Sequence, residues 1–190
     1  FADCVVVTCH QLITNRTFMS VEITYREANL SDVKKLSILF KQVYIQTYGV
    51  DGVSDEFANF ITVQFSVERI MRILQNNPGC LIVACKGSNL VGVAEIEFNK
   101  LSPVGNILAP ELNKLYILEW YCGKGIGEKL LAQVEHMVKE SGASQIWLWV
   151  LESNHRAIQF YQKHHYTIIG KAPFQMETNN YENNVMLKNL

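Results

Sequence analysis

A strand-like run, three alternating glycines and an amphipathic helical pattern follow one another between Leu115 and Leu131. Glycine lacks a Cβ, so successive backbone N–H groups at Gly123, Gly125 and Gly127 can converge on one anion. The first turn of the following helix adds unpaired N–H donors and the positive end of its dipole. The segment therefore predicts a strand–turn–helix unit that holds a phosphate or pyrophosphate. A glycine turn that only packs helix against strand is the alternative.

Two common nucleotide-binding patterns do not fit these glycines. The Walker A pattern, Gly-x4-Gly-Lys-Ser/Thr, has no match in the chain. The dinucleotide pattern Gly-x-Gly-x-x-Gly also fails, because Glu128 or Leu130 stands where the third glycine is required. Strand, glycines and helix nevertheless occur together, which favours phosphate binding over a bare packing turn.

Length and charge exclude several classes of protein. The chain has 190 residues, 48% of them hydrophobic, and a net charge of −1. One domain is expected at this length, and it should bury roughly 70% of the surface that its unfolded chain exposes. We expect no nucleic-acid partner, because no excess positive charge exists to replace the counterions on phosphates. We expect no membrane partner, because no apolar run reaches the ~18 residues of a membrane-spanning helix.

The cysteines and histidines carry no metal-binding pattern. There are five of each, with no Cys-x-x-Cys and no His pair at zinc spacing, so we expect no metal. An odd cysteine count at this length does not suit a disulfide framework. Reduced thiols, and hence a cytoplasmic location, are the simpler interpretation.

The first residues require separate treatment. The chain starts at Phe1, and a Met-Ser pair at Met19 and Ser20 precedes a strand-like run. Residues 1–18 lack the basic start and cleavage site of a signal peptide. We expect a vector-derived or misassigned leader over 1–18 and one domain over 19–190. An extra β-hairpin that includes the apolar run Cys4–Cys9 is the alternative.

Periodicity and capping signals predict one continuous α/β (α+β) domain. Ser31, Ser66 and Asn154 have side chains that suit helix N-caps, and 99–110, with two prolines and a glycine, is expected to be a loop. The order of elements suits one mixed sheet with helices on both faces. We expect helices at about 31–47, 54–63, 67–76, 125–141 and 154–163, and strands at about 21–27, 80–85, 90–98, 112–119, 145–151, 166–173 and 184–189.

Two motifs resemble the GCN5-related N-acetyltransferase (GNAT) superfamily. Its signature, Arg/Gln-x-x-Gly-x-Gly/Ala between a strand and a long helix, is similar to Cys122–Gly127, with Cys122 in place of Arg/Gln. Its segment Asn-x-x-Ala-x-x-Phe-Tyr-x-Lys is similar to Asn154–Lys163, and His165 and Tyr166 follow in place of the usual Gly-Phe. Two motifs in the correct order are more specific than either alone.

This resemblance covers about residues 20–190. It implies a single GNAT-type domain with a mostly antiparallel sheet of about seven strands. The helix start at Ser66–Glu68 and the chain end Val185–Leu190 look most like the polyamine-type acetyltransferases of the superfamily.

The resemblance implies acetyl-CoA as co-substrate and assigns residues to it. Its pantetheine would pair with backbone around Tyr116–Leu118, and its pyrophosphate would sit on N–H groups from Gly123 to Glu128. Asn154 would contact the pantetheine arm, and Tyr161 would act as general acid for the departing thiolate. A plain helix N-cap and a core aromatic are the alternatives for these two residues. The expected cofactor-binding residues are Tyr116, Ile117, Leu118, Cys122, Gly123, Lys124, Gly125, Ile126, Gly127, Glu128, Asn154 and Tyr161.

A free amine that attacks a thioester is helped by a general base with a raised pKa. The comparable place to the strand Glu of many superfamily members is Asn113, which cannot act as a base. We nominate Glu111 with Tyr161 as the catalytic residues, and a water relay or no base at all are the alternatives. A backbone N–H near Leu118 is expected to polarise the carbonyl oxygen. The glutamates considered as bases are Glu95, Glu97, Glu111 and Glu119, although an exposed Glu is usually only a solvated charge.

The resemblance places the acceptor site near the first helices and the strand at 90–98. Aromatic residues crowd that region, and we expect them to belong mainly to the core. They are Phe40, Tyr44, Tyr48, Phe57, Phe60 and Phe65. Acidic residues form a candidate mouth for a cationic amine. They are Asp51, Asp55, Glu56, Glu95 and Glu97.

These expectations together describe an acetyl-CoA-dependent N-acetyltransferase that acts on a primary amine, with a small amine or polyamine favoured. A protein N-terminal or lysine acetyltransferase is one alternative. A non-catalytic acyl-CoA-binding regulator of the same fold is the other. The expected partner is a small-molecule amine, and a homodimer is left open.

Overall fold

The computed structural model describes residues 22–176 and 178–190. The expected leader over residues 1–18, like the alternative hairpin, lies outside the described residues. Both therefore stay predictions.

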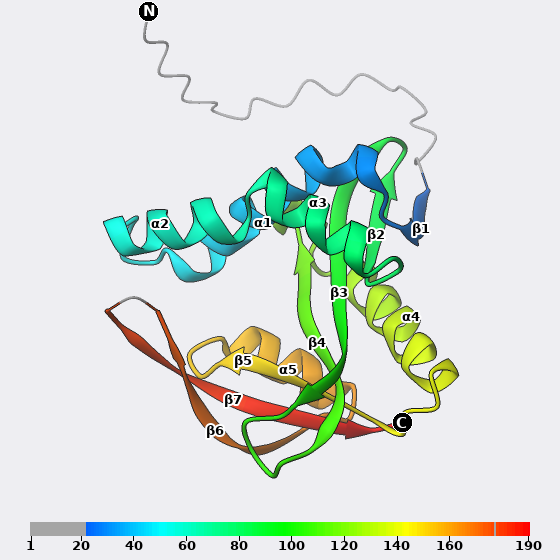
Figure 1. The fold of residues 1–190 in the computed structure, drawn as a ribbon, viewed down its shortest axis with the longest axis vertical. Coiled ribbons are helices and arrows are strands. Elements are labelled where there is room, and N and C mark those ends of the chain that lie inside the picture. Colours follow the sequence, from blue (N-terminus) through cyan, green and yellow to red (C-terminus); the bar gives the residue numbers. More distant parts are fainter. Residues whose placement is uncertain (1–21, 177) are drawn as a thin grey trace, which may run out of the picture.

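Seven strands of the described chain form one sheet in the order β1-β2-β3-β4-β5-β7-β6 (Figure 1). All neighbouring pairs in it run antiparallel except β4 and β5, which are parallel. The expected mixed, mostly antiparallel sheet is thereby confirmed. The strands are β1 (Ile23–Glu27), β2 (Leu81–Lys86), β3 (Asn89–Leu101), β4 (Leu108–Ile117), β5 (Gln145–Leu151), β6 (Thr167–Gln175) and β7 (Asn180–Asn189).

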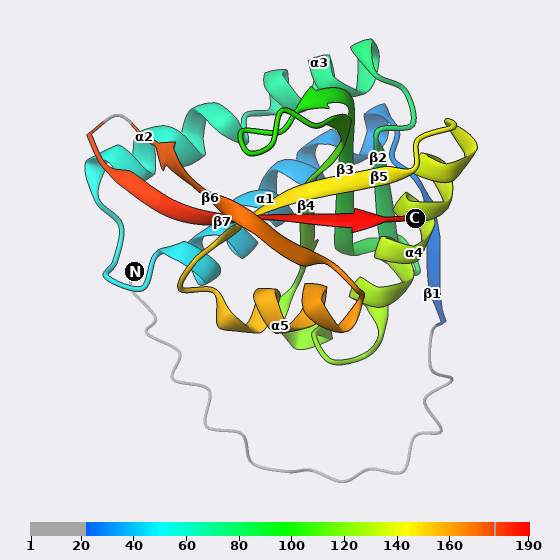
Figure 2. The same cartoon turned by 90° about the horizontal axis from the view of Figure 1, so that it is seen from below.

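Helices cover both faces of this sheet, as expected. One core cluster joins α1, α2 and α3 to one face of β2 and β3, and a second joins α4 and α5 to the opposite face. Figure 2 shows α4 and β1 at one end of the molecule, and α2 with the β6–β7 hairpin at the other. The helices are α1 (Val33–Tyr48), α2 (Asp55–Gln64), α3 (Val67–Asn76), α4 (Ile126–Glu140) and α5 (His155–Lys163).

The sheet divides between β4 and β5. In the described part of the chain these strands pair at one register position, Glu111 opposite Trp147. The indole Nε1 of Trp147 donates to the carbonyl oxygens of Ala109 at 3.1 Å and Lys100 at 3.3 Å, so this buried side chain ties β5 to both β4 and β3. Beyond this point β4 and β5 diverge (Figure 1). We call the gap between them the fork.

Two of the three predicted helix caps are confirmed. The Ser66 hydroxyl accepts from the N–H of Arg69, and the Asn154 side chain accepts from the N–H of Ala157. The predicted cap at Ser31 is wrong. Asn29 takes that role because its side-chain oxygen accepts from the N–H of Ser31, and a short 3-10 turn precedes α1.

The predicted loop at 99–110 is much shorter than expected. β3 continues to Leu101 and β4 already begins at Leu108, so both strands extend into the expected loop. The N–H of Ser102 donates to the carbonyl of Ile107 at 2.8 Å and closes the turn. Gly105 and Asn106 reverse the chain there with φ of 76° and 52°. Backbone pairing between long strands outweighs the local signal of the prolines.

Candidate acyl-transfer site at the fork

The glycine turn between β4 and α4 presents a row of backbone donors. Gly123 and Gly125 adopt φ of 72° and 76°, a conformation that L side chains rarely adopt. Among the described residues no side chain caps α4, and no atom lies within 4 Å of a Cβ built on Gly123 or Gly125. The first N–H groups of α4 have no partner inside the helix. The turn is therefore suited to an anion of phosphate size.

The third glycine differs from the other two. A Cβ built on Gly127 would lie 3.7 Å from the Phe160 ring of α5, an ordinary van der Waals contact, so Gly127 lies where the two helices pack. The open part of the segment, at Gly123 and Gly125, is the part that suits an anion. Ile126 is buried beneath the turn, and Glu128 in the first turn of α4 is exposed.

Two side chains of the turn contact its own backbone. The Cys122 thiol lies 3.9 Å from the carbonyl oxygen of Ile117 and 3.8 Å from that of Leu118. Burial raises the pKa of Cys122, which keeps it a neutral thiol. The Lys124 ammonium donates to the Trp120 carbonyl at 2.7 Å. These contacts hold both side chains against the backbone, so the groups of the turn left to face an anion are backbone N–H groups.

The edge of β4 that faces the fork is open. We expected a backbone N–H near Leu118 to polarise a substrate carbonyl, and the N–H of Leu118 itself is occupied, because it donates to the Val91 carbonyl of β3 at 3.0 Å. Successive N–H groups of a strand alternate between its two edges. The N–H of Ile117 therefore lies on the edge toward the fork, where it can serve in place of Leu118.

The two motif residues of α5 occupy different surroundings. The side-chain oxygen of Asn154 accepts the capping hydrogen bond from Ala157, which leaves the amide nitrogen for other contacts. Tyr161 is 8% exposed, and its ring packs 5.3 Å from Phe160 and 5.6 Å from Tyr166. Burial, with a smaller contribution from the phenol of Tyr48, raises the pKa of Tyr161. Tyr161 is therefore a neutral phenol that can donate a hydrogen bond.

A cavity of about 1150 Å³ opens at the fork. Helices α1, α2 and α3 line one side, and strands β3, β4, β5 and β7 line the other. All six aromatic residues that we expected mainly in the core also line this cavity. Phe40, Phe57 and Phe65 are buried, whereas Tyr44, Tyr48 and Phe60 remain partly exposed, so core and cavity wall share residues.

A β-bulge in β4 sets which side chains face the cavity. Lys114 stands opposite Glu95, but Leu112 stands opposite Ile96, so Asn113 is an extra residue. A regular strand would send Asn113 and Lys114 to opposite faces. The bulge instead lets both line the cavity, while Leu112 packs in the cluster under α4.

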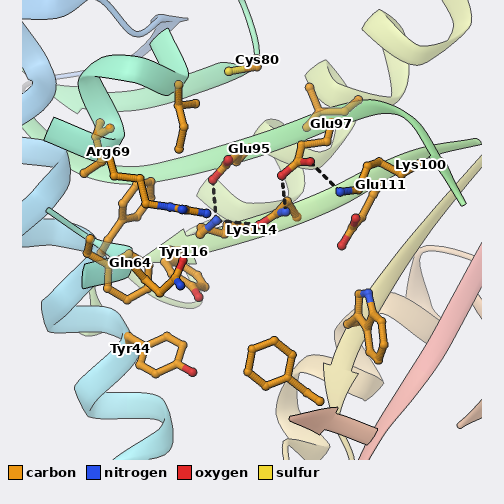
Figure 3. A pocket seen from close by; sticks show the side chains of 18 of the residues that line it. Tyr44, Gln64, Arg69, Cys80, Glu95, Glu97, Lys100, Glu111, Lys114 and Tyr116 are labelled. Atoms are coloured by element: carbon orange, nitrogen blue, oxygen red, sulfur yellow. Dashed lines mark hydrogen bonds and ion pairs between the residues drawn. The ribbon is translucent and has the colours of Figure 1, made fainter. Parts of the chain in front are cut away.

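A chain of polar contacts, here called the charge ladder, joins β3 to β4 along the cavity wall (Figure 3). The Lys114 ammonium lies 2.6 Å from the Glu95 carboxylate and 2.6 Å from the Asn113 oxygen. The Asn113 amide nitrogen donates to Glu97 at 2.7 Å. Lys100 completes the ladder at 2.9 Å from Glu97. Asn113 thus connects two ion pairs, and Glu95 and Glu97 are each bound to a lysine.

Glu111 lies apart from this ladder. It is 7% exposed and lines the cavity, and within the described residues no hydrogen bond or ion pair reaches its carboxylate. Burial raises the pKa of Glu111 to about 7, against a smaller opposing effect of the Lys100 charge. A carboxylate of this kind holds and releases a proton near neutral pH, which a general base requires.

The other expected acids are placed elsewhere. The Glu119 side chain is 63% exposed and pairs with Arg156 at 3.1 Å, and it does not line the cavity in the described structure. Asp51 and Asp55 are likewise outside the described cavity wall. With Glu95 and Glu97 neutralised by lysines, the expected acidic mouth is not formed by the described residues.

Glu56 instead holds the β6–β7 hairpin against α2. Its carboxylate accepts from the N–H groups of Thr178 and Asn179 and from the Asn179 amide. These bonds, chiefly that from Thr178, lower the pKa of Glu56. The Phe174 ring packs 6.0 Å from Phe60 beside them. The hairpin therefore closes the cavity on the side of α2.

Sequence reasoning missed Arg69, Lys100 and Lys114, which all line the cavity. Lys114 reaches it only because of the bulge, and no local pattern marks a bulge at Asn113. Arg69 lies in the first turn of α3, and nothing in the local sequence distinguishes it from an exposed helix residue. Their placement depends on tertiary structure.

Comparison with known proteins decides the family. A model of the acetyltransferase (GNAT) family matches residues 48–166. The chain belongs to this family. An uncharacterised N-acetyltransferase of Mycobacterium tuberculosis is 28% identical over 136 residues, which is 72% of this chain and 83% of that protein. A spermidine N(1)-acetyltransferase of Thermoplasma acidophilum is 26% identical over 154 residues, which is 79% of this chain and 90% of that protein.

The fold of this GNAT acetyltransferase is also similar to solved structures. A crystal structure of the PaiA N-acetyltransferase of Thermoplasma acidophilum in complex with coenzyme A superposes with a TM-score of 0.67 at 23% identity. The match covers 89% of this chain and 99% of that one. The GNAT resemblance and the expectation of an acetyltransferase are confirmed. The roles of individual residues stay predictions.

Two further observations bear on the expected partners. No helix in the described ranges, 22–176 and 178–190, is long and apolar enough to cross a membrane. In the same part of the chain, no three His, Cys, Asp or Glu side chains are grouped so that they could hold a metal ion.

Proposed function

We propose that this chain transfers an acetyl group directly from acetyl-CoA to the primary amine of a small molecule, polyamines being among the candidate acceptors. The observation that carries the proposal is the buried, unpaired carboxylate of Glu111 in the cavity at the fork. Its pKa of about 7 makes it a base at neutral pH. In support, one structural neighbour is a complex with coenzyme A, and one relative is a spermidine N(1)-acetyltransferase.

The residues present fit acetyl-CoA. The N–H groups from Gly123 to Glu128 would hold its pyrophosphate. In the described structure no side chain covers Gly123 or Gly125 or caps α4, so an anion can reach these groups. The open edge of β4 near Tyr116–Leu118 would pair with its pantetheine amides, as an added strand would. The free amide nitrogen of Asn154 would contact the same arm. Bound acetyl-CoA supplies an acetyl thioester.

Three groups of this chain would divide the chemistry. Glu111 in its carboxylate form accepts a proton from the attacking amine, whose nitrogen bonds to the acetyl carbon as the carbon–sulfur bond breaks. The N–H of Ile117 donates to the carbonyl oxygen while that oxygen gains negative charge. Tyr161 donates a hydrogen bond to the departing thiolate. Because its pKa is raised, Tyr161 stabilises the thiolate without giving up its proton outright.

The hairpin contacts on the side of α2 favour a small amine over a protein. An extended peptide needs an open groove, whereas the β6–β7 hairpin is held against α2 by Glu56 and by the contact of Phe174 with Phe60. A small molecule fits a volume of about 1150 Å³.

The decisive experiment measures thiol release from acetyl-CoA with a panel of small amines, polyamines and peptides. Turnover of small amines that is at least tenfold faster than that of peptides supports the proposal. Faster turnover of peptides would assign a protein acetyltransferase. Tight CoA binding without turnover of any amine would indicate a non-catalytic acyl-CoA-binding protein and overturn the proposal.

A further inference from the structure

The charged side chains of the cavity are almost completely paired. Glu95 is bound to Lys114 at 2.6 Å and Glu97 to Lys100 at 2.9 Å. Glu111 is the one carboxylate of the described lining without a basic partner, and Arg69 is the one cation of that lining without an acidic partner. Figure 3 shows the Arg69 side chain reaching into the cavity from α3.

This arrangement does not suit a polycation. A polyamine carries several ammonium groups, and each needs a carboxylate or an equivalent acceptor once water is excluded. Glu111 is the one carboxylate of the described lining left to bind an ammonium, and the amine bound there reacts after Glu111 has accepted its proton. A second ammonium would meet Arg69, or Lys100 and Lys114 in their ion pairs.

Aromatic side chains form one continuous part of the remaining wall, beside aliphatic residues and the uncharged amides of Gln64, Asn76, Asn77, Asn99 and Asn183. Tyr44 lies at its centre, with ring centroids 5.5 Å from Phe57, 5.3 Å from Phe60 and 5.2 Å from Phe65. Trp149, which is partly exposed, and Tyr181, which is 38% exposed, also line the cavity. In Figure 3 the Tyr44 ring projects into the cavity from α1. Such surfaces bind apolar and aromatic groups, because contact removes their faces from water.

We propose that the acceptor is a monoamine with an aromatic or bulky apolar body, and not a polyamine. This inference rests on the proposed function. The ammonium of such a molecule lies at Glu111, and its apolar body lies against Tyr44 and its aromatic neighbours. Arg69 and the paired lysines disfavour any second positive charge.

The test compares 2-phenylethylamine, propylamine and spermidine as acceptors at saturating acetyl-CoA. We expect kcat/KM for 2-phenylethylamine to exceed that for spermidine at least tenfold and that for propylamine at least threefold. Equal values, or a preference for spermidine, overturn the inference.

Two variants sharpen the comparison. Arg69→Glu adds an unpaired carboxylate to the cavity and should raise kcat/KM for spermidine at least threefold. Tyr44→Leu should raise KM for 2-phenylethylamine several-fold and leave that for propylamine within twofold. If Arg69→Glu leaves kcat/KM for spermidine unchanged, Arg69 does not disfavour a second positive charge. If Tyr44→Leu raises KM for both monoamines equally, Tyr44 does not bind the apolar body. Either result contradicts the inference.

A binding measurement separates this inference from the proposed function. Quenching of tryptophan fluorescence by each amine reports occupancy of the cavity, because Trp149 lines it. If no amine releases thiol, the proposed function fails. Tighter binding of 2-phenylethylamine than of spermidine would still support the cavity chemistry, and the reverse order would overturn it.

Discussion

Glu111 stands opposite Trp147 at the register position where β4 and β5 meet, and Trp147 fixes that position through bonds to Ala109 and Lys100. The unpaired carboxylate therefore sits where β4 and β5 are held together by these hydrogen bonds. A general base must hold its position relative to a bound substrate, so a rigid support is an advantage. The carboxylates of the charge ladder, by contrast, are occupied by lysines.

Replacement of Glu111, the proposed base, should remove the rise of kcat/KM with pH near neutrality. We expect Glu111→Gln to lower kcat at least a hundredfold at pH 8. In the wild type, kcat/KM should rise with pH through about 7, because the carboxylate is the active form and its pKa is about 7. The variant should lack this rise. Glu97→Gln, which alters a paired carboxylate, should keep it. If Glu97→Gln removes the rise and Glu111→Gln keeps it, the base is misassigned.

The same group should make the fold less stable at high pH. The folded pKa of Glu111 is about 7 against an ordinary 4.5, so the folded state binds more protons between these values and stability falls as pH rises through them. The loss is up to about 3 kcal/mol. Urea unfolding at pH 5 and pH 8 measures it. Glu111→Gln should be less pH-dependent and more stable than the wild type at pH 8. Glu182→Gln, at an exposed site, should behave as the wild type.

Two glycines at opposite ends of α4 provide a matched pair of variants to test the proposed role of the Gly123–Gly127 turn in binding CoA. Gly125 and Gly142 have φ of 76° and 83°, and a Cβ at either would contact nothing within 4 Å among the described residues. Valine at each should cost similar stability, about 1–2 kcal/mol. Only Gly125→Val should weaken CoA binding, at least tenfold by calorimetry. Equal CoA affinities in the two variants would show that the turn is not part of the CoA-binding site.

Phenylalanine variants of two neighbouring tyrosines, Tyr161 and Tyr166, distinguish a catalytic role from a packing role. Tyr161→Phe should lower kcat at least tenfold with little change in CoA affinity or melting temperature. Tyr166→Phe removes the hydroxyl that donates to Glu135 at 3.2 Å, so it should cost about 1 kcal/mol of stability and leave kcat near the wild-type value. Unchanged kcat in Tyr161→Phe would show that this residue is only a core aromatic.

The contact of Glu56 with the hairpin should control access to the acceptor site. Glu56→Ala removes the bonds to Thr178 and Asn179, so hydrogen exchange of the hairpin should become faster. KM for the acceptor should rise several-fold while CoA affinity stays unchanged. Asp51→Ala, at an exposed position, is the control. Unchanged exchange and unchanged KM in Glu56→Ala would mean that the cavity is closed by other contacts.

Local signals predicted the elements and the motif turn well. Caps at Ser66 and Asn154 act through hydrogen bonds within three residues, so the sequence alone reveals them. Ser31 failed because Asn29, two residues earlier, offers a competing cap. The strands around 99–110 were misjudged because pairing between β3 and β4 is a long-range effect that outweighs prolines.

The site was predictable only in part. Glu111 was one of four candidate glutamates, and nothing local distinguishes it from Glu95 or Glu97. The distinction lies in which carboxylates meet a lysine, and that depends on how β3 and β4 align. The aromatic residues were assigned to the core because helical spacing shows which residues face inward. It does not show that the fork leaves a cavity beside them.

Because Asn113 is an extra residue, the alternation of side chains between the two faces of β4 shifts by one residue at this position. Deleting it would restore regular alternation and rotate one half of the strand relative to the other. Leu115 and Ile117 would then exchange places with Lys114 and Tyr116, which would put apolar side chains into the cavity and a lysine under α4. Insertions and deletions are usually tolerated in loops and rejected in strands. In β4 the wild-type chain already contains the insertion, and the cavity exists in its present form because of it.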